Sequence, residues 1–226
     1  MIDILTITLG RELYLKRLIN SFVDDSGYKD FNFNYYIVYQ GNPTREFLDF
    51  MDTTPIKGNV RLIVNDQRVQ SVGVVMNEFK NKVSNKLFWK LDDDALLRSR
   101  NALHHIRAIN ELKPQAVFSP YPVGLINNPG GVLSKEHSVA YSESTDTYYT
   151  FRKVLHVGGF ARIMPIEFFK QMVFSDSHSE DTECSSWCNN NGKHMYYLEN
   201  GLIVEHQEST LGQHARYGKT YFRDRF

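Results

Sequence analysis

The sequence lacks an excess of charge of either sign, because 26 Lys and Arg residues balance 26 Asp and Glu residues. A strongly basic chain would favour nucleic acid as its partner, and the zero net charge gives no such bulk signal, although a local basic patch stays possible. Long apolar runs are also absent, since no stretch of about 18 residues has the character of a membrane span. Met1 leads directly into a strand-like segment, so we expect neither a membrane span nor a signal peptide.

Cysteine is scarce, and the chain contains two, Cys184 and Cys188. They lie four residues apart in a predicted helix, which puts both thiols on one helix face and gives no support for a disulfide scaffold. We therefore expect a reducing, cytoplasmic compartment. The 226 residues, 42% of them hydrophobic, are enough for one domain with a substantial core.

One stretch of the sequence joins a buried strand to dense negative charge. Residues 86–91 form a short, largely apolar run, and Asp92, Asp93 and Asp94 follow it directly. Adjacent anions repel one another, so this arrangement adds no stability unless it binds a divalent cation, which takes oxygen ligands and bridges to phosphate oxygens. In open α/β sheets the ligand crevice lies at the carboxyl ends of the strands. The stretch predicts a cation site, with a solvated acidic turn as the alternative.

The first half of the chain alternates strands with helices. Helical periodicity after the first strand is visible in Leu15, Leu18 and Phe22. Ser71 and Ser99 are the predicted N-caps of two later helices. This alternation predicts an α/β protein with a mostly parallel central sheet and helices on both faces. The predicted strands cover residues 2–9, 35–39, 60–64 and 86–91.

The second half is less regular. A predicted strand at residues 116–119 precedes a long polar stretch, residues 121–148. We expect this stretch to be a partly ordered loop that binds the acceptor or acts as a lid, with disorder as the alternative. The further predicted elements are a strand near 154–157, a helix that opens at Pro165, a helix over 180–191, a strand over 202–206 and a tail rich in Tyr, Arg and Lys.

The helix over residues 180–191 carries a carboxylate on its apolar side. Asp181 falls three residues before Cys184 and seven before Cys188, so the three share a face. A carboxylate in such surroundings is costly unless it has a partner or a task. The alternative is that Asp181, like Glu180, complements the positive end of the helix dipole.

The last predicted strand places His206 on the same face as the apolar Leu202, at the carboxyl end of the strand. Imidazole is a common ligand of transition metals such as Mn²⁺, so His206 is a candidate ligand of the cation expected at the aspartates. A hydrogen-bonded core histidine is the alternative. Gly158 and Gly159 either let the backbone approach a bound group closely or make a tight turn between strands. We expect the aspartates, Asp181 and His206 to meet at one pocket.

Several segments follow one another in a characteristic order, and this order resembles that of the family 2 glycosyltransferases with the GT-A fold. The resemblance spans nearly the whole chain, and the order and spacing of the motifs are more specific than any one of them. The segments are 6–11 with Leu15, Leu18 and Phe22; Asn65-Asp66 with 73–77; Leu91-Asp92-Asp93-Asp94, which resembles the DXD motif; 158–162 with Pro165 and Phe168; Glu180-Asp181; and His206.

The resemblance implies one GT-A (Rossmann-like) domain over residues 1–226, with a nucleotide-sugar-binding half at 1–98, an acceptor-binding half at 99–206 and a C-terminal tail at 207–226. It implies a metal-dependent, inverting transfer of a sugar from a nucleotide-sugar donor to an acceptor hydroxyl, with Mn²⁺ or Mg²⁺ as the cofactor. The implied roles are general base for Asp181; metal ligands for Asp92, Asp94 and His206; nucleotide-sugar binding for Thr8, Leu9, Gly10, Arg11, Gln40, Asp66, Asn77, Asp92 and Asp93; acceptor or donor-sugar contacts for Gly158, Gly159, Arg162 and Glu180; and diphosphate contacts in the tail for Arg216, Tyr217 and Lys219.

The sequence departs from the family pattern at two positions. Gln40 stands where the family usually has an Asp that helps to hold the nucleotide base, and Met76 stands where it often has Arg. Both departures leave the nucleotide undetermined. The acceptor is equally open among a glycan, a lipid-linked saccharide, a protein, a small metabolite and a modified base in DNA, and the basic, aromatic tail suits contacts to a nucleic acid.

Three other classes of protein compete with this interpretation. A nucleotidyltransferase would show a glycine-rich, basic phosphate loop near the first strand, where this chain has only Gly10-Arg11. A non-catalytic sugar- or nucleotide-binding module would not need Asp92, Asp94, Asp181 and His206 together. A metal nuclease is disfavoured by the zero net charge and by the lack of a clear basic stripe.

Overall fold

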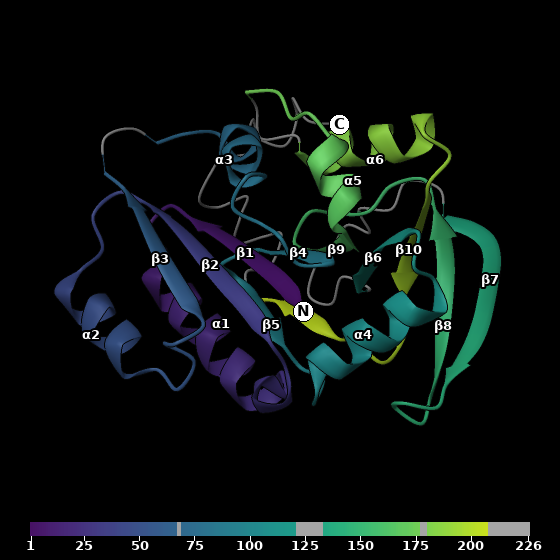
Figure 1. The fold of residues 1–226 in the computed structure, drawn as a ribbon, viewed down its shortest axis with the longest axis horizontal. Coiled ribbons are helices and arrows are strands. Elements are labelled where there is room, and N and C mark those ends of the chain that lie inside the picture. Colours follow the sequence, from purple (N-terminus) through teal and green to yellow (C-terminus); the bar gives the residue numbers. More distant parts are fainter. Residues whose placement is uncertain (67–68, 121–132, 177–179, 208–226) are drawn as a thin grey trace.

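The computed structural model describes residues 1–66, 69–120, 133–176 and 180–207, which form an α/β fold around one large sheet. Its strands are β1 (Ile2–Thr8), β2 (Phe33–Gln40), β3 (Val60–Asn65), β4 (Leu87–Leu91), β6 (Ala116–Pro120), β7 (Leu133–Ser142), β8 (Thr147–Val154), β9 (Ala161–Pro165) and β10 (His194–Leu198). Within the described residues these nine strands are hydrogen-bonded in the order β3-β2-β1-β4-β9-β6-β10-β8-β7 (Figure 1).

The sheet is parallel in its first half and mixed beyond it. β1 pairs in parallel with β2 and with β4, and β2 pairs in parallel with β3. β9 then runs antiparallel between β4 and β6, and β8 runs antiparallel between β10 and β7. The expectation of a mostly parallel sheet therefore holds for β1 to β4, and β6 and β10 also pair in parallel. The rest of the sheet is antiparallel, because β7, β8 and β9 follow one another along the chain without a crossover helix.

The α-helices in the described residues are α1 (Glu12–Asp25), α2 (Arg45–Thr53), α3 (Val72–Phe79), α4 (Ala102–Leu112), α5 (Ile166–Gln171) and α6 (Glu180–Asn190). They cover both faces of the sheet, as predicted (Figure 1). On one face α1, α2 and α4 pack around Phe22 and Trp89. On the other face α3, α5 and α6 pack around Phe88, whose ring stacks on that of Phe169 with centroids 3.8 Å apart.

The prediction of a long loop over residues 121–148 is wrong for the part that the structure describes. Residues 121–132 lie outside the described residues, but the remainder contains β7 and the start of β8, which form an antiparallel hairpin with Tyr141 opposite Tyr148. The inner face of this hairpin is buried at Tyr149, whereas the outer face meets solvent. An antiparallel sheet needs only one apolar face, so many residues of these strands are polar. The alternation of apolar and polar residues that marks a strand was therefore not recognised in this stretch.

Two other strand predictions differ from the structure. The strand expected near 154–157 is the end of β8, which stops at Val154. β9 and β10 are missing from the prediction, although β9 is fully buried and β10 largely so, in the second half of the sheet. Short apolar segments of this kind cannot be distinguished from helix turns by periodicity alone.

The helix caps were predicted with mixed success. Ser71 caps α3 as expected, since its hydroxyl accepts a hydrogen bond from Val74 N at 3.3 Å. Asn101, with a φ of 58°, stands at the N-cap of α4 in place of Ser99. The Ser99 hydroxyl instead accepts a hydrogen bond from Ile203 N at 2.5 Å. Ser99 therefore anchors the C-terminal segment rather than the helix.

A second, two-stranded sheet consists of β5 (Ala95–Leu97) and β11 (Val204–His206). The strands are antiparallel and place His206 opposite Ala95. The Gln207 side-chain amide donates to Tyr14 O at 3.1 Å and to Ala95 O at 3.2 Å. The pairing of β11 with β5 places the His206 imidazole near the end of β4. His206 is buried, as its position in the predicted strand indicated.

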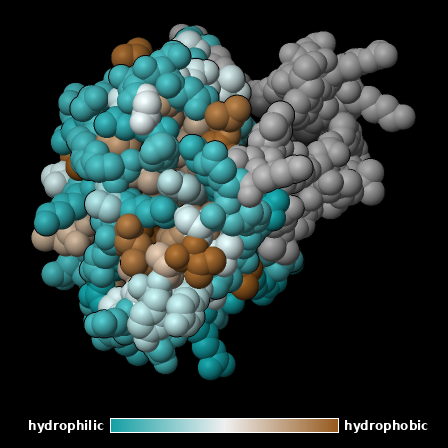
Figure 2. Space-filling view, turned by 90° about the vertical axis from the view of Figure 1, so that its right-hand side faces the viewer, coloured by the Kyte–Doolittle hydropathy of each residue, from teal (hydrophilic) through white to brown (hydrophobic). Residues whose placement is uncertain are grey.

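No helix among the described residues is long and apolar enough to cross a membrane. The side of the molecule that carries β7 and β8 is mostly hydrophilic and has small, separate hydrophobic patches (Figure 2). Val139 and Tyr148 are among the exposed apolar residues of these strands. Scattered apolar residues of this kind are normal on a protein surface and indicate no particular partner.

Asp3 fastens the start of β4 to β1. Its buried carboxylate accepts hydrogen bonds from Ser84 N, Asn85 N and the Asn85 amide, each at 2.8 Å, and from the Asn34 amide at 2.8 Å. Replacing Asp3 with Ala leaves these donors without an acceptor, so we expect a loss of about 3 kcal/mol in the free energy of unfolding, measured by urea denaturation. Asp24→Ala, on the exposed side of α1, is the control and is expected to change it by less than about 0.5 kcal/mol. A loss below about 1 kcal/mol for Asp3→Ala would contradict this role.

Candidate active site

Strand β4 delivers the three aspartates to the edge of the sheet. All five of its residues are buried between the two helix layers. Directly after the strand, Asp92 N donates to Phe160 O at 2.8 Å and Ala95 N donates to Asp92 O at 3.1 Å. These bonds turn the chain, and the three carboxylates then meet different partners. Asp93 and Asp94 are buried, whereas the side chain of Asp92 is 32% exposed.

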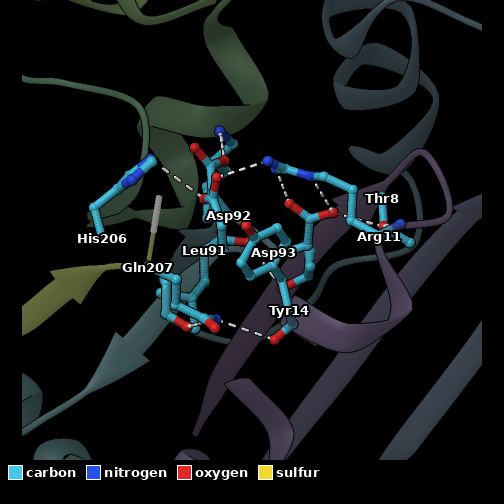
Figure 3. Close-up of polar contacts among 12 residues, drawn as sticks. Thr8, Arg11, Tyr14, Leu91, Asp92, Asp93, His206 and Gln207 are labelled. Carbon is cyan, nitrogen blue, oxygen red and sulfur yellow. Dashed lines mark hydrogen bonds and ion pairs between the residues drawn. The ribbon is translucent and has the colours of Figure 1, made fainter. Parts of the chain in front are cut away.

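Arg11 neutralises two of the aspartates from the loop after β1. Its guanidinium is bidentate to Asp93 and donates through Nη1 to Asp94 Oδ2 at 2.7 Å (Figure 3). The Thr8 hydroxyl donates to Asp93 Oδ2 at 2.6 Å. Burial raises the pKa of the Asp93 carboxyl to about 6, with Arg11 opposing this shift and Asp94 adding to it. The hydrogen bonds from Thr8 and Arg11 thus occupy the buried Asp93 carboxylate, which could contact a ligand only if Arg11 moved.

His206 approaches the aspartates from the opposite side to Arg11 (Figure 3). Its Nε2 lies 3.4 Å from Asp94 Oδ1. This carboxylate oxygen is buried and has no hydrogen-bond partner among the described residues. A buried carboxylate oxygen and an imidazole nitrogen that converge in this way fit two ligands of a divalent cation such as Mn²⁺. The expected meeting of Asp94 and His206 is therefore found.

Asp92, the third predicted metal ligand, is turned towards a different partner. It forms an ion pair with Lys90 Nζ, which also lies 3.2 Å from Glu180 Oε1. Among the residues that the structure describes, no three His, Cys, Asp or Glu side chains are gathered to hold a metal ion. Asp94 and His206 thus fit a cation, and Asp92 in this conformation does not.

Asp181 lies in the first turn of α6, beside the glycine turn that precedes β9. A Cβ atom on Gly159 would lie 3.4 Å from Asp181 Cβ and 3.0 Å from Glu180 Oε1, so the missing side chain allows this close approach. His156 Nε2 lies 3.8 Å from Asp181 Oδ2, and burial lowers the pKa of His156 although Asp181 opposes the shift. The Asp181 side chain is 37% exposed, so a ligand can reach it.

Hydrogen bonds fix the glycine turn both to α6 and to β10. Val157 N donates to the Ser185 hydroxyl at 3.3 Å, and Gly158 N donates to Tyr197 Oη at 3.3 Å. Ser185 Oγ in turn donates to Asp181 O at 2.9 Å. The turn and the start of the helix therefore form one unit.

Arg162, which we expected to contact the acceptor or the donor sugar, does not reach the surface of the described structure. It is fully buried, and its Nη1 donates to Glu180 O at 3.4 Å. The free thiols of Cys184 and Cys188 are buried on the same helix, as their spacing predicted. Arg162 therefore contacts the first turn of α6 from inside the fold.

Two predicted nucleotide-binding residues are occupied inside the fold. Gln40 is buried, and its Oε1 accepts a hydrogen bond from Gln70 N at 2.5 Å. The Asn77 amide donates to Phe174 O at 2.6 Å, and its oxygen accepts from Phe174 N at 3.1 Å. Gln40 thus holds the segment before α3, and Asn77 holds α3 against the segment after α5. Both have a structural role that the sequence did not indicate.

Of the other predicted nucleotide-binding residues, Thr8 and Asp93 are buried, whereas Leu9, Gly10 and Asp66 lie at accessible positions. Leu9 and Gly10 are exposed in the turn after β1, where Gly10 has a φ of +87° that suits glycine. Asp66 lines a hollow of about 380 Å³ beside β3 and α3, together with Asn65 and Gln70. Arg216, Tyr217 and Lys219, the predicted diphosphate contacts of the tail, lie outside the described residues.

Two site residues escaped the sequence analysis. Lys90 gave a readable signal, because it is a lone charge within the buried strand Leu87–Leu91. His156 gave none, because it lies in a loop between elements whose arrangement the sequence does not reveal.

The comparison with known proteins rests on structure alone. No protein-family model matches the sequence, and no curated protein matches it either. The fold matches structures of GT-A glycosyltransferases. The crystal structure of GalNAc-T7 with UDP, GalNAc and Mn²⁺ superposes with a TM-score of 0.64 at 13% identity, over 91% of this chain and 43% of that one. The crystal structure of S. aureus TarS 1-349 in complex with UDP-GlcNAc superposes with a TM-score of 0.65 at 15% identity, over 92% of this chain and 58% of that one.

A third structure, S. aureus TarS 1-349 in complex with UDP, matches with a TM-score of 0.61 at 15% identity, over 92% of this chain and 60% of that one. This chain therefore spans about half the length of the structures that it matches. At this level of identity the likeness establishes the α/β fold with a mixed sheet. The activity has to be argued from the site.

Proposed function

We propose that this chain is a metal-dependent, inverting glycosyltransferase, which moves a sugar from a nucleoside diphosphate sugar to an acceptor hydroxyl. One observation carries the proposal: Asp94 and His206, 112 residues apart in the chain, converge at the carboxyl end of β4, where Asp94 Oδ1 lies 3.4 Å from the imidazole Nε2 and has no hydrogen-bond partner among the described residues. Burial of a carboxylate oxygen that accepts no hydrogen bond from the described residues costs free energy, which a bound cation would offset. The ligand crevice of such sheets lies at this edge.

The chemistry proposed for the site begins with the leaving group. Asp94 and His206 would hold the cation, which when bound supplies positive charge against the negative charge that grows on the departing diphosphate. Arg11, whose side chain reaches the surface in part, is placed to bind a phosphate oxygen once it leaves the aspartates. Thr8 and Asp66 remain our candidates for contacts to the nucleotide.

Asp181 would act as the general base. It accepts the proton of the acceptor hydroxyl while the acceptor oxygen forms its bond to the anomeric carbon and the bond from that carbon to the diphosphate oxygen breaks, with its electron pair leaving on the diphosphate. Attack from the face opposite the leaving group inverts the configuration. Gly159 allows the glycine turn to pack closely against the first turn of α6, since a Cβ there would lie 3.4 Å from Asp181 Cβ, and the Asp181 side chain stays 37% exposed.

A thermal-shift screen of nucleoside diphosphate sugars, with and without Mn²⁺, tests the proposal. A donor at about a hundred times its Kd should raise Tm by about 5–10 °C, and the rise should depend on Mn²⁺. The hit is then incubated with Mn²⁺, and release of the nucleoside diphosphate is measured. Binding without release would favour a non-catalytic binding module, and no binding by any nucleotide sugar would contradict the proposed function.

A further inference from the structure

Lys90 is a charged residue in the middle of a buried strand. Its side chain is 4% exposed and points to the same face of the sheet as Phe88, towards α5 and α6. A lysine in such a place is costly unless carboxylates compensate its charge. The strand opposite makes the cost larger, because Lys90 pairs in register with Arg162 of β9, and like charges directly opposite each other repel.

Two carboxylates from different parts of the fold compensate Lys90. Asp92 follows β4 and forms an ion pair with Nζ, while Glu180 of α6 places Oε1 3.2 Å from the same nitrogen. Gly159 makes room for this cluster, since a Cβ there would lie 3.5 Å from Lys90 Nζ and 3.0 Å from Glu180 Oε1. The ammonium is thus the bridge between the end of β4 and the start of α6.

The bridge also separates the aspartates into two groups. Asp93 and Asp94 face Arg11 and His206, whereas Asp92 faces Lys90. Glu180 precedes Asp181 in α6, so a group that fixes the first turn of this helix also fixes the neighbouring carboxylate.

We propose that Lys90 is a positioning residue, which ties Asp92 to Glu180 and so holds the helix that carries Asp181 while keeping Asp92 away from the cation. This inference rests on the proposed function for the identity of the cation and of the base. The tie itself does not depend on either, and it can be tested separately.

The first test is a double-mutant cycle on the urea unfolding midpoint. Lys90→Met should lower the midpoint, because it leaves a buried carboxylate without its partner. Adding Glu180→Gln to Lys90→Met should lower it no further, because the stranded charge is then removed. Lys86→Met, which removes the same charge at an exposed position one residue before β4, is the control and should leave the midpoint unchanged. Additive shifts for Lys90→Met and Glu180→Gln would overturn the tie.

The second test is a calorimetric titration with Mn²⁺ alone. In the wild-type background Asp92→Asn should leave the affinity unchanged, whereas in the Lys90→Met background Asp92→Asn should weaken it by about tenfold or more, because Asp92 is then free to act as a ligand. If Lys90 only stabilised the fold, Lys90→Met would not make the Mn²⁺ affinity depend on Asp92. Loss of Mn²⁺ binding by Asp92→Asn in the wild-type background would overturn the inference.

The two tests separate the inference from the proposed function. A wild-type protein that binds no Mn²⁺ would contradict the proposed cation site. The urea unfolding midpoints alone would then test the role of Lys90. Non-additive shifts for Lys90→Met and Glu180→Gln would support the bridge between Lys90 and Glu180, and additive shifts would overturn it.

Discussion

Asp181→Asn is expected to keep the affinity for the donor while turnover falls by about a hundredfold or more, the usual lower limit for the loss of a general base. The side chain keeps its size and its place in the first turn of α6, so binding should survive. Its amide cannot accept the proton of the acceptor hydroxyl, so the attack slows. The measurement is the release of nucleoside diphosphate under saturating donor and acceptor, together with a calorimetric Kd for the donor.

The matched control is Asp24→Asn, the same chemical change at an exposed position of α1. It should alter neither turnover nor donor affinity. If Asp181→Asn retains turnover near that of the wild-type protein, Asp181 is not the base. His156 is the next residue to test in that event, because its Nε2 lies 3.8 Å from the Asp181 carboxylate.

Asp94→Ala is expected to abolish Mn²⁺-dependent binding of the donor. The substitution removes the carboxylate oxygen that lies 3.4 Å from His206 Nε2, and with it one of the two protein ligands that we propose for the cation. It also frees Arg11 from one partner, so donor binding that does not require Mn²⁺ need not fall. The measurement is a calorimetric titration of the donor with and without Mn²⁺.

Folding of the Asp94 variant has to be checked independently, because the residue is buried. Asp94→Asn preserves the side-chain shape and should also lose the Mn²⁺ dependence, since an amide is a weaker ligand than a carboxylate. His104→Ala, on α4, serves as the control for a lost imidazole. Unchanged Mn²⁺-dependent binding in a folded Asp94→Ala variant would remove Asp94 from the cation site.

The sequence predicted the first half of the fold better than the second for a physical reason. β1 to β4 are parallel strands separated by helices, so each change of period marks an element boundary. In the second half β9 and β10 are short, buried strands that reach the centre of the sheet through long-range pairing with β4 and β6. No local sequence pattern predicts pairing between strands so far apart in the chain. The three residues of β5 are too few to show any period.

The site shows the same limit. The placement of Asp94 beside His206 followed from strand ends and faces, which the sequence encodes. The partners of Arg11, Asp92 and Gln40 depend on the rotamers of long side chains, which the spacing of residues does not fix. The sequence could therefore indicate which residues gather at the edge of the sheet, but it could not indicate which charge would neutralise which.

The small β5–β11 sheet has a consequence for the protein during its synthesis. A ribosome releases Arg11 and the aspartates long before it releases His206, and folding of a nascent chain tends to start from its N-terminal part. Arg11 and Lys90, two cations that pair with the acidic triplet, are therefore released from the ribosome before the imidazole. His206 follows Asp94 by 112 residues, so a growing polypeptide gains the complete pair of groups that we propose to bind the cation only after that length of chain has been added.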